Sequence, residues 1–304
     1  MGYGVHAGIH AVEGATMMRE VALTAVLVTS ACSVPKMPLN SRVAALPPSE
    51  IVAGCCDRAG SYPDWVIEVA DDNAQTVRRL GQIQLRPGHL TRQPEAVSLV
   101  KKALRPLDVV FLHSANRVSG HLIPGRFTHG VIYLGTEKQL RAAGLWNLPA
   151  LASVRDKIAD GAVFLEAVYG GVRLARADVV LDSDAVVALR PKKADRAAAL
   201  RRGLERIGVP FDIRFDARDP SALFCAELIE LMFPEANLPR TVVPGRETIL
   251  NDAIIAETLS GNLPFGMVGY VEATSRGGAR VLSAHDLAWD VRQSWPNAER
   301  VAGR

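Results

Sequence analysis

The sequence predicts an α+β fold, and three observations support this prediction. Short apolar runs rich in valine and leucine are gathered in the middle of the chain, stretches with helical spacing lie on both sides of them, and no strand–helix–strand unit repeats. Of the 304 residues, 48% are hydrophobic and 22% are charged. This composition is close to the average of soluble globular chains and excludes intrinsic disorder, collagen and coiled coil as the main state.

The charge balance and the small number of cysteines exclude several classes of function. Lysine and arginine number 35 against 32 acidic residues, and no basic run is interleaved with aromatic residues, so the sequence predicts no nucleic-acid partner. No apolar run reaches the roughly 18 residues of a membrane-spanning helix. Four cysteines are too few for a disulfide scaffold. The adjacent Cys55 and Cys56 are expected to be poor disulfide partners, and without a second pair or a nearby histidine they do not predict a metal site.

Residues 1–32 have the pattern of a secretory leader. Arg19 precedes a short apolar stretch from Val21 to Val28, and small residues then lead to Cys32. These small residues resemble the cleavage site of bacterial lipoproteins, where the cysteine becomes the lipidated first residue, although Thr29 stands where such sites usually have leucine. Met17 or Met18 would then be the true start.

The leader pattern predicts a lipoprotein of the cell envelope, held at the membrane through lipidated Cys32. Residues 33–48 are predicted to form a tether, because prolines recur between Lys36 and Pro48, at positions 38, 47 and 48. The alternative is an ordinary apolar N-terminal helix with an incidental Cys32, in a cytoplasmic chain.

Residues 49–103 are predicted to form a helical segment, with its clearer helix from Asp64 to Leu80. Residues 104–258 are predicted to form the core, and residues 259–304 a C-terminal extension. The core's strands are expected at Asp108–Leu112, Gly130–Gly135, Ala162–Val168, Val172–Leu174 and Ala185–Leu189. Its helices are expected at Asp195–Ile207, closed by Gly208, and at Pro220–Phe233, stopped by Pro234. The extension is expected to contain a strand at Phe265–Glu272, a turn at Gly277-Gly278 and a helix at about Ser283–Ser294.

His129 is the first candidate for chemistry. It opens an otherwise apolar strand directly after the Pro124-Gly125 turn, where a rigid scaffold presents a reactive side chain to solvent. The alternative is a histidine at the edge of the core that is satisfied by a backbone carbonyl.

Glu166 is the second candidate, because it interrupts an apolar strand. It lies either on the solvent face of an edge strand or beside a basic partner. Alternation places Phe164 and Val168 on the same face as Glu166, and these apolar neighbours favour a partner.

Cys225 is the third candidate. Helical spacing places it with Leu228, Ile229 and Met232 on the inward stripe, and Glu227 and Glu230 outward. By itself Cys225 reads as a small core residue. It lies, however, near the start of a predicted helix, where the helix dipole lowers the pKa of a thiol, and a nearby imidazole would lower it further and take the proton.

The order of these three residues reverses the cysteine-first order of papain-like enzymes. The chain resembles the circularly permuted papain-like amidases (YiiX/YebB-like hydrolases), a branch of the NlpC-type cysteine hydrolases. Five segments between about Leu104 and Pro244 carry the resemblance: Leu107-Asp108, Pro124 to Gly135, Glu166 to Val172, Val209 to Asp212, and Cys225 to Leu228. Phe211 stands where the family usually has tyrosine, Ala226 replaces a common serine, and an insertion spans about Thr136 to Asp160.

The resemblance implies a permuted papain-like core, with an antiparallel sheet packed on the helix that carries the nucleophile. It implies that Cys225 attacks an acyl carbonyl, that His129 acts as base and then acid, and that Glu166 orients the imidazole. The backbone N–H of Cys225 would stabilise the oxyanion, and no metal or organic cofactor is implied. The expected activity is hydrolysis of an amide or ester acyl bond in a small acyl compound or a peptide, through a thioester.

Two alternatives to that activity remain open. One is an acyltransferase or lipid hydrolase, because lecithin:retinol acyltransferase is a distant relative with the same permutation. The other is a binding lipoprotein that keeps the fold without catalysis. The presence of Cys225, His129 and Glu166 together favours an enzyme over a binding protein.

Overall fold

The computed structural model describes residues 41–56, 72–243 and 245–295. The chain divides into two compact units, residues 1–35 and residues 36–304, and every described residue belongs to the second. The leader, Cys32 and most of the tether therefore lie outside the described residues. The same holds for the first half of the helix predicted from Asp64, of which α5 (Ala74–Gly81) is described.

One antiparallel sheet organises the second unit. Its strand order is β4-β3-β2-β1-β5-β8-β9, and every neighbouring pair runs antiparallel. The strands are β1 (Asp108–His113), β2 (His129–Tyr133), β3 (Phe164–Val168), β4 (Gly171–Ala175), β5 (Ala185–Pro191), β8 (Phe265–Ala273) and β9 (Ala279–Leu282). All six predicted strands are present, and the α+β prediction is confirmed. A separate hairpin, β6 (Arg240–Val243) with β7 (Arg246–Ile249), was not predicted.

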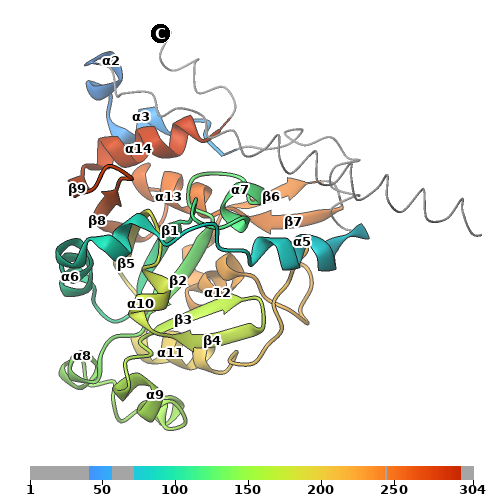
Figure 1. Cartoon of the computed structure of the whole chain (residues 1–304). Helices are drawn as coiled ribbons and strands as arrows, with labels where there is room; N and C mark the ends of the chain where they lie inside the picture. Colours follow the sequence, from blue (N-terminus) through green and yellow to red (C-terminus); the bar gives the residue numbers. More distant parts are fainter. Residues whose placement is uncertain (1–40, 57–71, 244, 296–304) are drawn as a thin grey trace, which may run out of the picture. The chain divides into compact units, whose positions relative to one another are not determined.

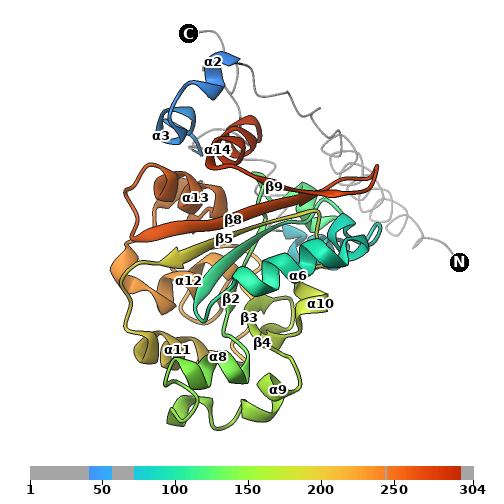
Figure 2. The same ribbon diagram turned by 90° about the vertical axis from the view of Figure 1, so that its left-hand side faces the viewer.

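Helices cover both faces of this sheet (Figures 1 and 2). The helix α12 (Cys225–Met232) contacts β2 and β3, and α13 (Asn251–Leu259) contacts β8, whereas α6 (Pro94–Ala103) lies on the opposite side. The remaining α-helices are α2 (Ser41–Ala44), α3 (Pro48–Ile51), α7 (Ser119–Leu122), α8 (Glu137–Ala142), α9 (Arg155–Ala159), α10 (Ala177–Val180), α11 (Arg196–Leu204) and α14 (Ala284–Gln293). Short 3-10 turns are η1 (His89–Arg92), η2 (Pro149–Leu151) and η3 (Pro234–Ala236). Among the described residues, no helix has both the length and the apolar character needed to cross a membrane.

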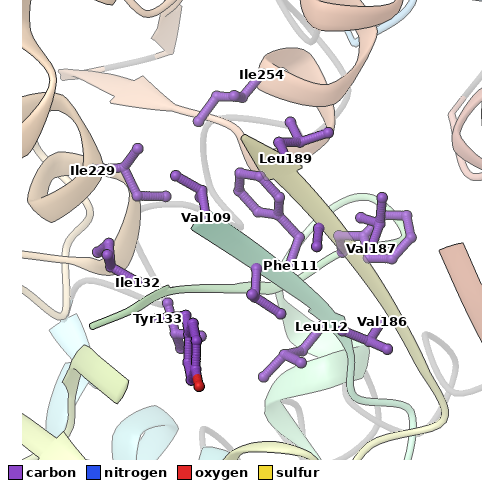
Figure 3. Packing of buried hydrophobic residues seen from close by; sticks show 14 of the residues in the cluster. Val109, Phe111, Leu112, Ile132, Tyr133, Val186, Val187, Leu189, Ile229 and Ile254 are labelled. Atoms are coloured by element: carbon purple, nitrogen blue, oxygen red, sulfur yellow. The ribbon is translucent and has the colours of Figure 1, made fainter. Parts of the chain in front are cut away.

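The core lies between the sheet and the two helices α12 and α13. Figure 3 shows Ile229 of α12 and Ile254 of α13 on the side of the sheet where Val109 and Phe111 lie. All four side chains are buried. The apolar stripe of α12 thus fixes the helix against the sheet, because burying each large aliphatic side chain contributes about 1.5–3 kcal/mol.

The start of α12 differs from the prediction. The helix begins at Cys225 instead of Pro220. Pro220 and Ser221 lie in a turn, and the residues directly before Cys225 are extended, because Leu223 forms a bridge with Phe211 and its N–H donates to the carbonyl of Pro210. This pairing with the Val209–Asp212 segment outcompetes one more helical turn and places Cys225 in the first helical position.

Two further expectations were wrong. Glu227 was expected to point outward, but it is buried, because its carboxylate accepts a hydrogen bond from the backbone N–H of Phe224 at the start of α12. Cys55 and Cys56 were expected to be poor partners, but the structure joins them in a disulfide across a tight turn that gives Cys56 a positive φ.

The insertion between β2 and β3 does not disturb the sheet. Its residues form α8, η2 and α9, while β2 and β3 pair directly, with Val131 opposite Glu166. The spacing between His129 and Glu166 along the chain is therefore long, whereas their spacing in the sheet is short.

Candidate active site

His129 is the first residue of β2, and the strand positions its side chain. It stands opposite Leu112 of β1, two residues before Val131, which is aligned with Glu166 of β3. Because side chains alternate along strands, His129 and Glu166 lie on one face of neighbouring strands. The Nε2 of His129 lies 3.1 Å from the Oε2 of Glu166, and its side chain is 22% exposed.

Glu166 has two basic partners. Its other oxygen, Oε1, accepts a hydrogen bond from the Nε of Arg173 at 3.0 Å, and Arg173 stands directly opposite it on β4. The carboxylate is almost fully buried, whereas the side chain of Arg173 is 54% exposed. Burial would raise the pKa of Glu166, but the hydrogen bonds and charges of His129 and Arg173 hold it below its usual value.

Cys225 meets the imidazole from the other side. The thiol is buried at the start of α12 and forms a hydrogen bond with His129. Since Glu166 occupies Nε2 of the ring, Nδ1 is the nitrogen available to the sulfur. The backbone N–H of Gly130 and the side chain of Asn251 also interact with the sulfur.

The electrostatics of this group favour a thiolate beside an imidazolium. Burial alone would lower the pKa of His129, but its hydrogen bonds to Cys225 and Glu166 raise the pKa to about 10. Burial alone would raise the pKa of the Cys225 thiol, but the hydrogen bond and positive charge of His129 bring it below its usual value. Both shifts favour transfer of the thiol proton to the imidazole, which gives the nucleophilic form of the cysteine.

The loop that leads into His129 is fixed at several atoms. The backbone N–H groups of Arg126 and Phe127 donate to the buried carboxylate of Asp252 at 2.7 and 2.9 Å. The carbonyl of Arg126 accepts a hydrogen bond from Nδ1 of His113 at 2.7 Å. Gly125 has a φ of +95°, and a Cβ there would lie 2.6 Å from an oxygen of Asp252, so the turn requires glycine.

The side chain of Arg126 anchors the same loop to the sheet. Its Nε donates to the hydroxyl of Tyr270 at 3.0 Å and its Nη2 to Glu272 at 2.6 Å, with Asp290 at 3.6 Å. Tyr270, Glu272 and Asp290 are all buried. The loop therefore delivers His129 from a rigid support, which is what a preorganised site requires.

The structure brings the three residues singled out from the sequence, Cys225, His129 and Glu166, into one chain of hydrogen bonds. Sequence reasoning missed Arg173, which faces Glu166 across strands, and Asn251 and Asp252, which begin α13. An Asn-Asp pair before an apolar run is a helix-start signal that would have marked α13. Within the described ranges, no group of three or more histidine, cysteine, aspartate or glutamate residues is arranged to hold a metal ion.

Comparison with known proteins gives one match. The model of a family described as permuted papain-like amidase enzyme, YaeF/YiiX, C92 family, matches residues 104–260, just over half of the chain. No curated protein and no solved structure matches. The matched region contains Cys225, His129 and Glu166, together with the start of α13.

Proposed function

The chain belongs to the family of permuted papain-like amidases, which are cysteine-type hydrolases, and from this membership we propose that it cleaves an amide or ester acyl bond through a thioester on Cys225. His129 is the general base and acid of this proposal, and Glu166 orients it. The observation that carries the proposal is the continuous contact from Glu166 through His129 to Cys225.

In the first half of the reaction, the thiolate of Cys225 attacks the acyl carbonyl carbon. The carbonyl oxygen becomes an oxyanion near the first N–H groups of α12, which have no acceptor within the helix and lie at its positive end. The imidazolium of His129 gives its proton to the leaving nitrogen or oxygen, the bond to the leaving group breaks, and a thioester remains.

In the second half, the now neutral imidazole of His129 takes a proton from water, and the resulting hydroxide attacks the thioester carbonyl. The second tetrahedral intermediate collapses with release of the carboxylic acid, and the sulfur leaves as the thiolate. The imidazolium is restored beside it. Glu166 stabilises this charged ring in both halves and holds Nε2, which leaves Nδ1 as the ring nitrogen available to the sulfur.

The proposal is tested with an electrophilic thiol probe and with candidate substrates. Cys225 should be alkylated rapidly by iodoacetamide even at mildly acidic pH, and Cys225→Ser should lose this rapid labelling. A variant with Cys55→Ser and Cys56→Ser serves as the matched control and should keep it. Rapid labelling that survives Cys225→Ser would mean that the nucleophile is misassigned.

Product analysis then separates the possible activities. The wild-type enzyme is incubated with N-acyl peptides, with peptides and with phospholipids, in the presence and absence of an added amine or alcohol acceptor. Release of a free acid supports hydrolysis, whereas acyl transfer to the acceptor in preference to water would establish an acyltransferase. A well-folded wild-type protein whose thiol is ordinary and which acts on none of these substrates would favour a binding protein.

We also propose, from the sequence pattern at its N-terminus, that the chain is exported and anchored at the cell envelope through lipidated Cys32. Supporting this are the apolar stretch before Cys32 and the small residues next to it. The mature protein should partition into detergent and lose that property in Cys32→Ser. A freely soluble protein that keeps its N-terminal methionine would contradict export.

A further inference from the structure

Asn251 lies against the sulfur of Cys225 from a part of the chain that carries no other proposed catalytic group. It is the first residue of α13, and its side-chain Nδ2 is 3.8 Å from Sγ of Cys225, within hydrogen-bond range for sulfur. The residue is buried, and it follows Leu250, which is the N-cap of the helix and has no side-chain capping hydrogen bond; the side-chain amide of Asn251 contacts Cys225 instead. Capping of the first backbone N–H groups of the helix therefore does not explain the position of this amide.

The amide is only partly satisfied inside the protein. Its Oδ1 is fully buried and has no hydrogen-bond partner among the described residues. A buried amide that leaves its oxygen unpaired costs stability, about 1–3 kcal/mol for a typical group. Of the two polar atoms of this amide, the nitrogen has a partner, the sulfur of Cys225, and the oxygen has none among the described residues.

The orientation of the amide fits a charged sulfur. A thiolate accepts hydrogen bonds and donates none, so it is stabilised by the Nδ2 group and would be repelled by Oδ1. The opposite amide orientation would suit only a protonated thiol. Since His129 and Cys225 together favour the thiolate–imidazolium form, the orientation with Nδ2 toward the sulfur is the consistent one.

Gly130 makes room for this contact. A Cβ at Gly130 would lie 3.3 Å from Oδ1 of Asn251, 3.0 Å from Cδ1 of Ile229 and 3.2 Å from Cε1 of Phe111. These distances are tighter than ordinary side-chain packing. The glycine that follows His129 thus lets the amide of Asn251 lie close against β2, beside the nucleophile.

We propose that Asn251 is a further catalytic residue, whose side-chain amide donates a hydrogen bond to the thiolate of Cys225 and so holds the sulfur in its charged, reactive form. This inference rests on the proposed function, because it assigns the amide a role in the same thiolate. It gives the nucleophile a third support besides His129 and the N–H of Gly130.

The test is the pH dependence of Cys225 alkylation by iodoacetamide, a readout that needs no substrate. Asn251→Ala removes the donor at a position that does not cap the helix, and Asn251→Asp keeps the shape but places a carboxylate at the sulfur. We expect the apparent pKa of the thiol to rise by about one unit in Asn251→Ala, as expected for a lost hydrogen bond to a charged group, and further in Asn251→Asp. The acid limb of kcat/KM should move in parallel.

The matched control is Asn262→Ala, just past the far end of the same helix, where the exposed amide bonds only Glu257 at the surface. It should leave the alkylation profile unchanged. Gly130→Ala, which crowds the amide, should shift the profile in the same direction as Asn251→Ala. An unchanged profile in both Asn251 variants, with a low thiol pKa in wild type, would overturn the inference alone. An ordinary thiol pKa in wild type would overturn the proposed ion pair as well.

Discussion

Glu166→Gln is the sharpest test of the orienting role proposed for this acid. The substitution removes the negative charge and nearly preserves the shape. Glutamine has one side-chain oxygen, whereas the carboxylate accepts from His129 at 3.1 Å with one oxygen and from Arg173 at 3.0 Å with the other. In the variant, therefore, only one of the two donors keeps an acceptor.

The expected loss follows from the bond to the imidazolium. A hydrogen bond to a charged group contributes about 1.5–3 kcal/mol, and roughly 1.4 kcal/mol corresponds to a tenfold change in rate. If the remaining oxygen stays with Arg173, turnover should fall about 10-fold to 150-fold. The pKa of His129, raised to about 10 in wild type by Cys225 and Glu166, should also fall, so the alkaline limb of kcat/KM should move to lower pH.

The assay is kcat/KM against pH on any substrate that the wild-type enzyme accepts, with thermal unfolding as a check on folding. Glu137→Gln is the matched control. It removes an exposed acid that pairs with Arg141 at 2.7 Å within α8, and an exposed pair of this kind contributes little. Wild-type turnover together with an unmoved alkaline limb in Glu166→Gln would refute the orienting role and make Glu166 a structural acid.

Three further outcomes are expected. Arg173 supports Glu166 from a half-exposed position, so Arg173→Met should lower kcat/KM in the same assay by less than Glu166→Gln does, and an equal loss would contradict this. Burial raises the pKa of Glu227 from 4.5 to about 8, so its ionisation destabilises the fold increasingly as pH rises from 4.5 to 8. In urea unfolding, Glu227→Gln should match wild type at pH 4.5 and exceed it at pH 9, and equal stability at both would contradict the buried acid. Burial and the charge of Arg126 lower the pKa of His113 from 6.5 to about 4, so wild-type stability should fall as pH drops through that window, and His113→Gln should flatten the fall.

The strands and the three candidate residues could be predicted because their signals are local. A short run of β-branched and apolar residues marks a strand wherever it pairs, and the motifs around His129 and Cys225 are contiguous in the chain. Glu166 could be singled out across a long insertion because it interrupts a short apolar strand and lies in one of the segments that carry the family resemblance, whereas its register, with Val131 of β2 opposite Glu166, comes from the structure.

The rest depends on contacts between distant segments. Asp252 holds the loop before His129 from about 125 positions further along the chain, and Asn251 reaches Cys225 from another element. Neither residue carries a local signal of its role. The start of α12 at Cys225 could not be predicted either. The bridge between Leu223 and Phe211 competes with helix formation, and the helix propensity of a segment takes no account of pairing with a distant segment.

Leu107 shows the same limit at a single residue. Leu107, directly before the aspartate that begins β1, has a φ of +75°. This left-handed backbone is unfavourable for a branched side chain, yet Leu107 is buried and its N–H donates to the carbonyl of Tyr133. Core packing and a strand hydrogen bond offset a local preference that would have favoured glycine.

The charges of the site alternate along its chain of contacts. Thiolate, imidazolium, carboxylate and guanidinium follow one another from Cys225 through His129 and Glu166 to Arg173, so the group is neutral as a whole. Only the guanidinium reaches well into solvent. Removing His129 leaves the buried sulfur of Cys225 without its basic partner, and removing Glu166 leaves the imidazolium with the sulfur as its remaining acidic partner, so each loss also weakens the contacts that the other members make. Substitutions at these positions should therefore act on one unit, and their effects on turnover should not add.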